Sequence, residues 1–204
     1  MLPEIFLKLA KLYEENGFSL YMVGGTSRDF LLGKEISDFD FATDATPEQE
    51  KKFLQEGDYS FSSYGIIKIK HQGIHIDIAT FRIEKNYLDY RHPSKVMFTK
   101  SMELDSKRRD FTINAIYIDK CGHVFDFFSG IFDLRNRILR FIGNPIDRIK
   151  EDPLRIIRGE RFAKKLNLKI EKKSKDAIYS FSFLLDNLNP RKVEMERKKF
   201  DVLF

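Results

Sequence analysis

The chain has 204 residues, of which 42% are hydrophobic and 33% are charged, a composition that excludes a disordered polypeptide and allows a sizeable core. No apolar run is long enough to span a membrane, the N-terminal residues lack the layout of a secretory signal, and one cysteine, Cys121, excludes an internal disulfide. A formal net charge of +5 permits a polyanionic partner, although lysine-rich stretches are also ordinary solvated helix faces. Together these features predict a reduced, cytoplasmic protein without a structural zinc site.

The first half of the chain predicts alternating helices and strands. Apolar periodicity, glycine stops and a Thr46-Pro47 helix start define the elements. In chain order they are a helix over 3–16, a strand over 18–23, a turn at 24–25, a helix over 26–32, a strand over 37–43, a helix from 47 to about 57, and a hairpin of strands 64–70 and 74–82.

The character of the sequence changes after Asn144-Pro145. Before it, residues 84–104 are polar and irregular and predict a loop with one short strand at 96–98, and residues 112–118 predict another strand. After it, strand signals vanish and helices are expected over 145–150, 153–167, 171–187 and 191–203. We therefore expect an α+β domain over residues 1–142 and an all-helical domain over residues 143–204.

Two aspartates alternate with two phenylalanines in the stretch Ser37-Asp38-Phe39-Asp40-Phe41. Because successive strand side chains point to opposite faces, Asp38 and Asp40 are expected on one face and the phenylalanines on the other. Two carboxylates with Cα atoms about 7 Å apart repel each other unless a cation lies between them, and their hard oxygens suit Mg²⁺. The pattern predicts a metal site, whereas the plain alternative is an exposed acid pair.

A third acid, Asp77, lies between two isoleucines in the predicted hairpin. The isoleucines point to one face of the strand and leave Asp77 on the other. Three acids on neighbouring strands are the arrangement that two-metal phosphoryl transfer uses.

A glycine pair, Gly24 and Gly25, stands where the first strand ends and a helix begins. Backbone amides at a helix start attract phosphate, and the missing Cβ atoms let it approach closely. Arg28 follows about one helical turn later, so its guanidinium can reach the same phosphate. The alternative is an ordinary turn with a surface arginine, since neither a P-loop nor a dinucleotide-binding fingerprint is present. A phosphate cradle a dozen residues before an acid pair predicts a nucleoside triphosphate site.

These motifs resemble those of the class II tRNA nucleotidyltransferases, the CCA-adding enzymes and their bacterial poly(A) polymerase relatives. Five stretches match in order: VGGTSRDFLLGKEISDFDFAT (23–43), IDIATFR (76–82), DYRHPSKV (89–96), RRDFTINAI (108–116) and EDPLRIIRGERFA (151–163). The resemblance implies a polymerase-β-like nucleotidyltransferase head with a small mixed sheet, followed by a helical neck. Family members continue into a body and tail that hold tRNA, so the chain corresponds to the head and neck portion.

The resemblance also assigns roles to individual residues. The family's metal ligands match Asp38 and Asp40, with Asp77 at the third acidic position, where the family often has Glu. The nucleotide-binding positions match Gly24, Gly25, Arg28, Arg109, Asp110, Asp152, Arg155, Arg158 and Arg161. Among these, Asp152 and Arg155 match a pair that reads the base edge in place of a nucleic-acid template.

Alternatives remain for the last motif and for the flexible-loop motif. Asp152 before Pro153 could simply cap a helix, and the three arginines could pair with Glu151, Glu160 or Asp147. The loop motif keeps Asp89, Arg91, Pro93 and Val96, which disfavours an enzyme that adds only C, but Tyr90 replaces the family's usual glycine. Asp105-Ser106-Lys107 also departs from the usual pattern.

The expected function is template-independent addition of C and/or A to the 3′ end of tRNA from CTP and ATP, with Mg²⁺. Poly(A) synthesis and A-only or CC-only addition are the alternatives within the family. A catalytically silent RNA-binding module is the alternative of another class. Two C-terminal basic clusters are expected to hold the RNA backbone: Lys164, Lys165, Lys169, Lys172, Lys173 and Lys175, and Arg191, Lys192, Arg197, Lys198 and Lys199.

Overall fold

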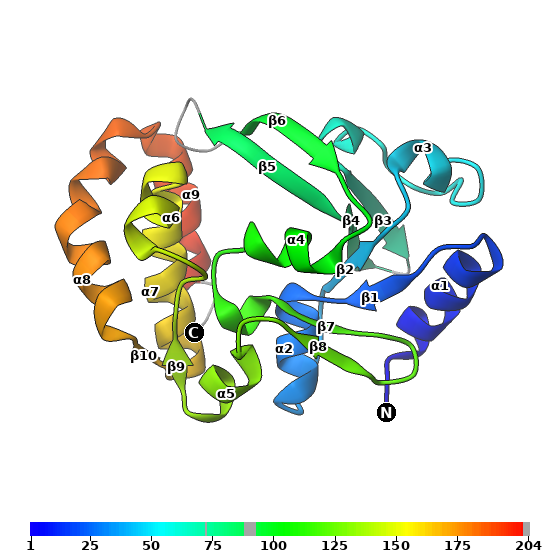
Figure 1. The fold of residues 1–204 in the computed structure, drawn as a ribbon, viewed down its shortest axis with the longest axis horizontal. Helices are drawn as coiled ribbons and strands as arrows, with labels where there is room; N and C mark the ends of the chain where they lie inside the picture. Colours follow the sequence, from blue (N-terminus) through cyan, green and yellow to red (C-terminus); the bar gives the residue numbers. More distant parts are fainter. Residues whose placement is uncertain (72, 88–92, 202–204) are drawn as a thin grey trace. The chain divides into compact units, whose positions relative to one another are not determined.

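The computed structural model describes residues 1–71, 73–87 and 93–201, and these form two compact units (Figure 1). The first unit comprises residues 1–84, 96–108 and 114–127, and the second comprises residues 85–95, 109–113 and 128–204. The main division thus follows residue 127, whereas the sequence places a domain boundary after residue 142. The functional domain assignment remains a prediction.

A six-stranded mixed sheet organises the first unit, with the strand order β3-β4-β2-β1-β7-β8. Strands β2 and β4 pair in parallel, and the other neighbours pair antiparallel. The strands are β1 (Leu20–Met22), β2 (Phe39–Thr43), β3 (Ile66–His71), β4 (Ile74–Thr80), β7 (Ile116–Ile118) and β8 (Val124–Asp126). The predicted hairpin is confirmed as β3 and β4, and the predicted small mixed sheet is confirmed with it.

Helices α1 (Glu4–Glu15) and α2 (Gly24–Leu31) form where the sequence predicts them. Helix α3 (Pro47–Glu50) begins at the predicted capping box of Thr46 and Gln49 but ends about seven residues earlier than expected. The main core of this unit joins α1 to the sheet through Phe6, Tyr13, Met22, Phe41 and Ile67 and their neighbours. Phe39 and Phe41 of β2 are buried in this core, so Asp40 between them points to the other face of the strand.

The expectation of a loop over residues 84–104 is wrong for most of that range, although the short strand predicted at 96–98 does form, as the end of a longer strand. Strands β5 (Arg82–Tyr87) and β6 (Pro93–Phe98) form a two-stranded sheet, and α4 (Met102–Lys107) follows, capped by Ser101. The flexible-loop residues Asp89 and Arg91 lie outside the described residues. Polar strands such as β5, RIEKNY, carry little apolar alternation, so their pairing leaves a weak signal in the sequence.

The second unit is mainly helical, as predicted. Its elements are α5 (Gly130–Arg135), β9 (Ile138–Leu139), α6 (Pro145–Glu151), α7 (Leu154–Leu166), β10 (Lys169–Ile170), α8 (Lys172–Phe181), the 3₁₀ helix Ser182–Asn187 and α9 (Pro190–Asp201). The sequence missed the short parallel pair of β9 and β10. Phe111, Phe141, Ile149, Ile156 and Ile178 belong to its core.

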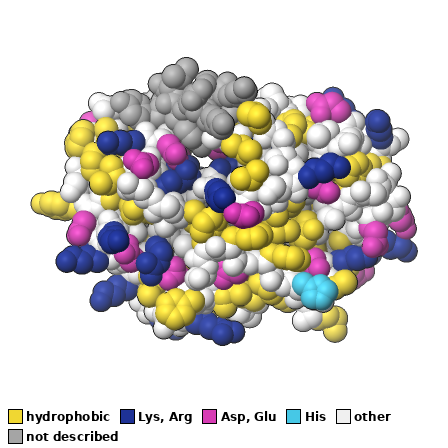
Figure 2. Space-filling model, in the orientation of Figure 1, with side chains coloured by type: hydrophobic (Ala, Val, Ile, Leu, Met, Phe, Trp, Pro, Cys, Tyr) yellow, Lys and Arg dark blue, Asp and Glu magenta, His cyan; other side chains and the backbone are white. Residues whose placement is uncertain are grey.

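The surface of the second unit is strongly charged near α8. Lys and Arg side chains, dark blue in Figure 2, gather on the side where α8 lies in Figure 1. Within the described part of the chain, no helix combines the length and apolar character needed to cross a membrane.

Candidate active site

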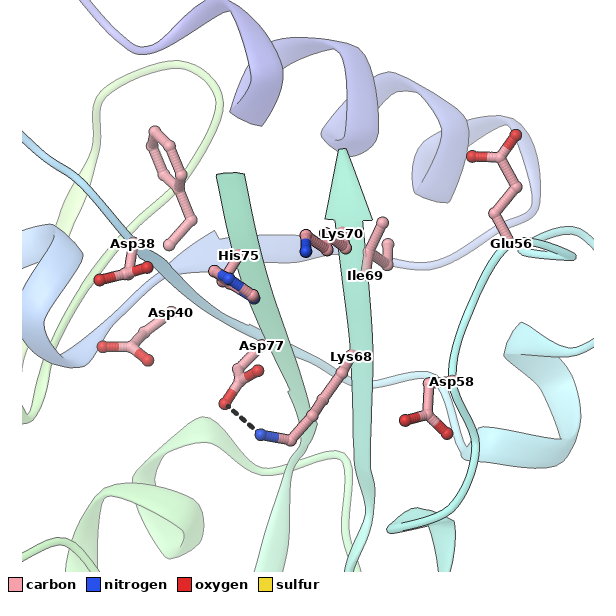
Figure 3. Close-up of a pocket in the computed structure, with 10 residues that line it drawn as sticks. Asp38, Asp40, Glu56, Asp58, Lys68, Ile69, Lys70, His75 and Asp77 are labelled. Atoms are coloured by element: carbon pink, nitrogen blue, oxygen red, sulfur yellow. Dashed lines mark hydrogen bonds and ion pairs between the residues drawn. The ribbon is translucent and has the colours of Figure 1, made fainter. Parts of the chain in front are cut away.

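The acid pair lies at the start of β2, and the predicted alternation is observed. Phe39 and Phe41 are buried, whereas Asp38, just before the strand, and Asp40, within it, are exposed. Both aspartates line one pocket of about 540 Å³ in the first unit (Figure 3). The strand period therefore presents both carboxylates at an open surface, as the sequence predicts.

Asp77 joins this pocket from the neighbouring strand. It stands directly opposite Asp40 in the parallel register of β2 and β4, while Ile76 and Ile78 point into the core. A lysine from the next strand, Lys68, lies opposite Asp77 and holds its Oδ2 at 3.4 Å. The third acid is therefore next to the pair, as predicted, but it has a cationic partner that the sequence analysis missed.

The donor atoms suit a hard cation, although they are not drawn tightly together. Asp40 accepts a hydrogen bond from the Gly25 amide at 3.1 Å, and Asp77 contacts Lys68. Across the described residues, the only group of three His, Cys, Asp or Glu donors within 4.8 Å of one another is Asp119, Cys121 and His123. Three carboxylates facing one open pocket are nevertheless a donor set that fits Mg²⁺.

The glycine pair is required by the close approach of Asp40. Gly24 has φ of +64°, and a Cβ atom on Gly24 or Gly25 would lie 3.0 or 3.2 Å from Asp40 Oδ2. Helix α2 begins at this corner, and the amide of its second residue, Gly25, points at Asp40. The glycines thus leave room for the Asp40 carboxylate, and they also leave the helix start open to an anion.

Arg28 lies at the same corner, but its guanidinium is buried and already paired. Its Nε and Nη2 donate to Asp29 at 2.9 Å, and its Nη1 donates to Asn114 at 2.8 Å. A Cβ atom on Gly25 would stand 3.6 Å from Arg28 Nη2, which places the cation beside the glycines. The Arg-Asp adjacency signals Asp29, whereas Asn114 lies 86 residues away and gives no local signal.

The remaining predicted nucleotide contacts all belong to the second unit, and some of them cluster. Arg158 bridges Asp110 at 3.3 Å and Asp152 at 2.8 Å. Asp152 also accepts from the amide of Leu154, the first residue of α7, at 3.1 Å, so its carboxylate satisfies a helix-start amide, although the N-cap position itself is Pro153. The main-chain carbonyl of Arg109 accepts a hydrogen bond from Arg148 at 2.9 Å.

The two residues expected to read the base are linked through the backbone, where the Arg155 amide donates to the Asp152 carbonyl at 3.0 Å, but their side chains bind other partners. Arg155 donates to Glu151 at 2.6 Å and to the Arg148 carbonyl at 2.8 Å, and both Arg155 and Asp152 are buried. The pairing of Arg155 with Glu151 was one of the alternatives that the sequence left open. Arg161 pairs with Glu196 on α9, a partner that sequence reasoning missed.

An open mixed sheet with acids on two adjacent strands beside a helix-start glycine corner defines the head of a nucleotidyltransferase fold of the polymerase-β type. The chain belongs to the family described as the poly A polymerase head domain, whose model matches residues 20–140. The predicted family and fold are thereby confirmed.

Individual known proteins agree with this assignment. A CCA-adding enzyme from Enterococcus faecalis is 40% identical over 198 residues, covering 96% of this chain and 49% of that protein. The structure of the Bacillus stearothermophilus CCA-adding enzyme in complex with CTP has a TM-score of 0.88 at 33% identity, covering 98% of this chain and 49% of that one. A tRNA nucleotidyltransferase complexed with primer tRNA and an incoming ATP analog has a TM-score of 0.69 at 30% identity, covering 86% and 50%. The chain spans about half the length of these relatives.

Proposed function

We propose that this chain carries the catalytic head and the neck of a template-independent tRNA nucleotidyltransferase, which adds C and/or A to the 3′ end of tRNA from CTP and ATP. The observation that carries the proposal is the register of Asp40 opposite Asp77 on an exposed face, with the glycine corner of α2 bonded to Asp40. The relatives named as CCA-adding enzymes support the substrate class. A cytoplasmic location, suggested by the single cysteine, is part of the same proposal.

The reaction is attack of the RNA 3′-hydroxyl on the α-phosphate of the nucleotide, with pyrophosphate as the leaving group. Asp38 and Asp40, with Asp77 beside them, would hold Mg²⁺, which supplies charge neutralisation and activation of the hydroxyl in such reactions. The Gly24 and Gly25 amides and Arg28 would hold the triphosphate end, because helix-start amides and a guanidinium attract phosphate and Arg28 Nη2 lies beside Gly25. In this proposal the triphosphate lies on the glycine side of Asp40, and the metal lies on the side of Asp38 and Asp77.

Selection of the base is assigned to Asp152 and Arg155. A carboxylate accepts from a base amino group and a guanidinium donates to ring nitrogen or carbonyl, so one such pair reads the Watson-Crick edge of C or A. The present partners of these side chains, Arg158 and Glu151, are then exchanged in part for the nucleotide. Asp110 belongs to the same cluster through Arg158 and is assigned to the ribose-binding motif.

The test is single-nucleotide extension by the purified chain with Mg²⁺. The substrates are tRNA lacking CCA, or ending in C or in CC, with CTP, ATP or both. Addition of C, C and A followed by a stop is the expected result. A long A tract, or A only on the CC end, would move the function to the relatives that make poly(A) or add A alone.

A second measurement separates the enzyme from a silent RNA-binding module. Magnesium-dependent binding of CTP or ATP should be present in the wild type and lost in Asp38→Ala. Nucleotide binding that is unchanged by this substitution, together with absent extension, would favour the silent module.

A further inference from the structure

A row of basic side chains lies beside the acids on the same open face of the sheet. Lys68 stands opposite Asp77 in the antiparallel register of β3 and β4, and Lys70 stands opposite His75. Both lysines and His75 are exposed, whereas Ile67 and Ile69, which alternate with the lysines along β3, point into the core. Figure 3 shows Lys68, Lys70 and His75 around the pocket that Asp38 and Asp40 also line. Lys68, Lys70 and His75 are called the β3–β4 strip below.

The strip lies across the acids from the glycine corner. The strand order β3-β4-β2-β1 puts β1, which leads into α2, on one side of β2, and β4 and β3 on the other. Asp40 therefore stands between Gly25, which contacts it, and Asp77 with Lys68 beyond. The two sides differ in chemistry, since the corner offers helix amides and Arg28, and the strip offers two exposed lysines.

In phosphoryl transfer the two substrates approach the phosphorus from opposite sides, so the glycine corner and the β3–β4 strip should bind different substrates. The attacking and leaving oxygens lie roughly in line, on opposite sides of the phosphorus. A triphosphate whose leaving end rests on the glycine corner requires the attacking hydroxyl to arrive from the side of β4 and β3. The group that carries this hydroxyl is a polynucleotide end, and its phosphodiesters are anions.

The charges of the pocket leave the lysines able to take such anions. Lys68 holds Asp77 through a long contact of 3.4 Å between side chains that are each nearly half exposed, so the pair exchanges readily for another partner. Asp58, also in this pocket, has its Oδ1 bonded to the amide and hydroxyl of Ser60. Asp58 is thus partly occupied by Ser60, although its charge still interacts with Lys68, and Glu56 is a further acid of the pocket with which a bound phosphodiester would compete.

We propose that the β3–β4 strip binds the phosphodiester groups next to the 3′ end of the acceptor RNA and delivers its hydroxyl to the acid pair. This inference rests on the proposed function and names the subsite of its second substrate. The strip acts on the acceptor alone, and the incoming nucleotide is held by other groups.

The experiment compares the wild-type chain with the double variant Lys68→Gln/Lys70→Gln. The matched control is Lys11→Gln/Lys52→Gln, which removes the same charge from exposed lysines of the same unit. The probe is a short labelled single-stranded RNA that ends in CC with a 3′-deoxy terminus, so that binding is measured with Mg²⁺ and ATP but without turnover. Affinity is followed by fluorescence anisotropy over a series of salt concentrations, and ATP affinity is measured separately.

The strip variant should bind the RNA about 10-fold more weakly than the control variant. Two lost contacts should make the plot of log affinity against log salt shallower by about 1.4, at roughly 0.7 for each single-strand phosphate contact. ATP affinity should stay within about twofold of the wild type.

The other outcomes separate this inference from the proposed function. A wild type that binds and extends RNA, with a strip variant that matches the control, overturns the strip alone. Loss of ATP affinity in the strip variant overturns it too and assigns the lysines to the triphosphate. A wild type that binds ATP but neither binds nor extends any RNA overturns both proposals.

Discussion

At the scale of single residues, one buried hydroxyl ties the acid pair to the glycine corner. Thr26, on the first turn of α2, accepts from the Asp40 amide at 2.6 Å and donates to the Asp38 carbonyl at 3.4 Å. The amide of Val23 adds a bond to the Asp40 carbonyl at 3.0 Å. The spacing of the two aspartates is therefore fixed by the same helix that begins at Gly24.

Thr26→Val should loosen this connection, because it keeps the shape of the side chain but removes the acceptor of the part-buried hydrogen bond from the Asp40 amide. The free energy of unfolding should fall by about 1–3 kcal/mol, which is the usual cost of such a group. The Mg²⁺ concentration for half-maximal nucleotide binding should also rise. Urea unfolding and nucleotide titrations measure both effects. Thr26→Ser is the control, and equal behaviour of the Val and Ser variants would show that the hydroxyl has no positioning role.

A second residue-scale prediction concerns the buried carboxyl of Glu50, which accepts a hydrogen bond from Tyr13. Burial, followed by the nearby charge of Glu48, raises the pKa of Glu50 to about 8 from an ordinary 4.5, although the Tyr13 bond opposes this shift. The folded state therefore holds a proton that the unfolded state loses. The stability from Glu50 is complete below about pH 4.5 and is lost as the pH rises towards 8.

Glu50→Gln should remove this dependence because the amide stays neutral. The free energy of unfolding of the wild type should fall relative to that of the variant between pH 5 and 8, by up to about 1.4 kcal/mol per pH unit. Denaturant unfolding at several pH values measures the difference. Parallel curves for the two proteins would contradict a raised pKa of Glu50.

At the scale of elements, a buried acid on α4, in a stretch that the sequence left as loop, connects its own helix to the start of β5 and to β7. Asp105 accepts from the Arg82 amide at 3.1 Å, from Arg108 Nε at 2.8 Å and from the Tyr117 hydroxyl at 2.6 Å. It is fully buried, and so is the Tyr117 ring on β7. The stretch Asp105-Ser106-Lys107 departs from the family's usual pattern, but it keeps the acid Asp105, which has a structural role here.

Asp105→Ala should destabilise the first unit strongly, because it leaves Arg108 and a buried hydroxyl without this acceptor. The expected loss is about 3–5 kcal/mol, as for other broken buried pairs. Glu103→Ala is the matched control on the same helix, since Glu103 is exposed and pairs with Lys107 on the surface; about 1 kcal/mol or less is expected. Equal shifts in thermal unfolding for the two variants would refute the connecting role of Asp105.

Local patterns predicted those elements that bury one regular face. The alternation in β2 placed Phe39 and Phe41 inside and Asp40 outside, and the capping box at Thr46 formed as expected. Strands β9 and β10 escaped prediction because each has two residues and exists through a parallel partner about thirty residues away.

In the candidate site, too, the features that depend on neighbouring residues were predicted and the distant partners were missed. The acids and glycines were found because strand period and helix-start chemistry act over a few neighbouring residues. The partners Asn114 of Arg28, Lys68 of Asp77 and Glu196 of Arg161 come from other elements, and only the tertiary fold brings them there. Sequence therefore predicted which acids and glycines lie together at the candidate site better than it predicted which side chains they pair with.

At the scale of the whole molecule, part of the excess positive charge gathers at the start of α8, where it should destabilise the helix. Three exposed lysines, Lys172, Lys173 and Lys175, occupy three of the first four positions of α8, where the helix dipole favours negative charge. Glu171 caps the helix through Ser174 but leaves that turn basic. Positive side chains and helix amides at one place together form a surface that attracts phosphate.

Replacing these three lysines by glutamine should therefore have opposite effects on folding and on RNA binding. The free energy of unfolding should stay equal or rise, by about 0.3–1 kcal/mol for each charge removed at low salt. Affinity for tRNA should fall, and the plot of log affinity against log salt should become shallower by about 2, because three contacts at roughly 0.7 each are lost. The control removes Lys8, Lys11 and Lys52 instead, which changes the net charge equally. If both triple variants lose the same affinity and slope, the attraction is a property of net charge alone. If only the α8 variant does, the C-terminal lysines form a local contact with the RNA backbone, and their unfavourable position on the helix has a functional reason.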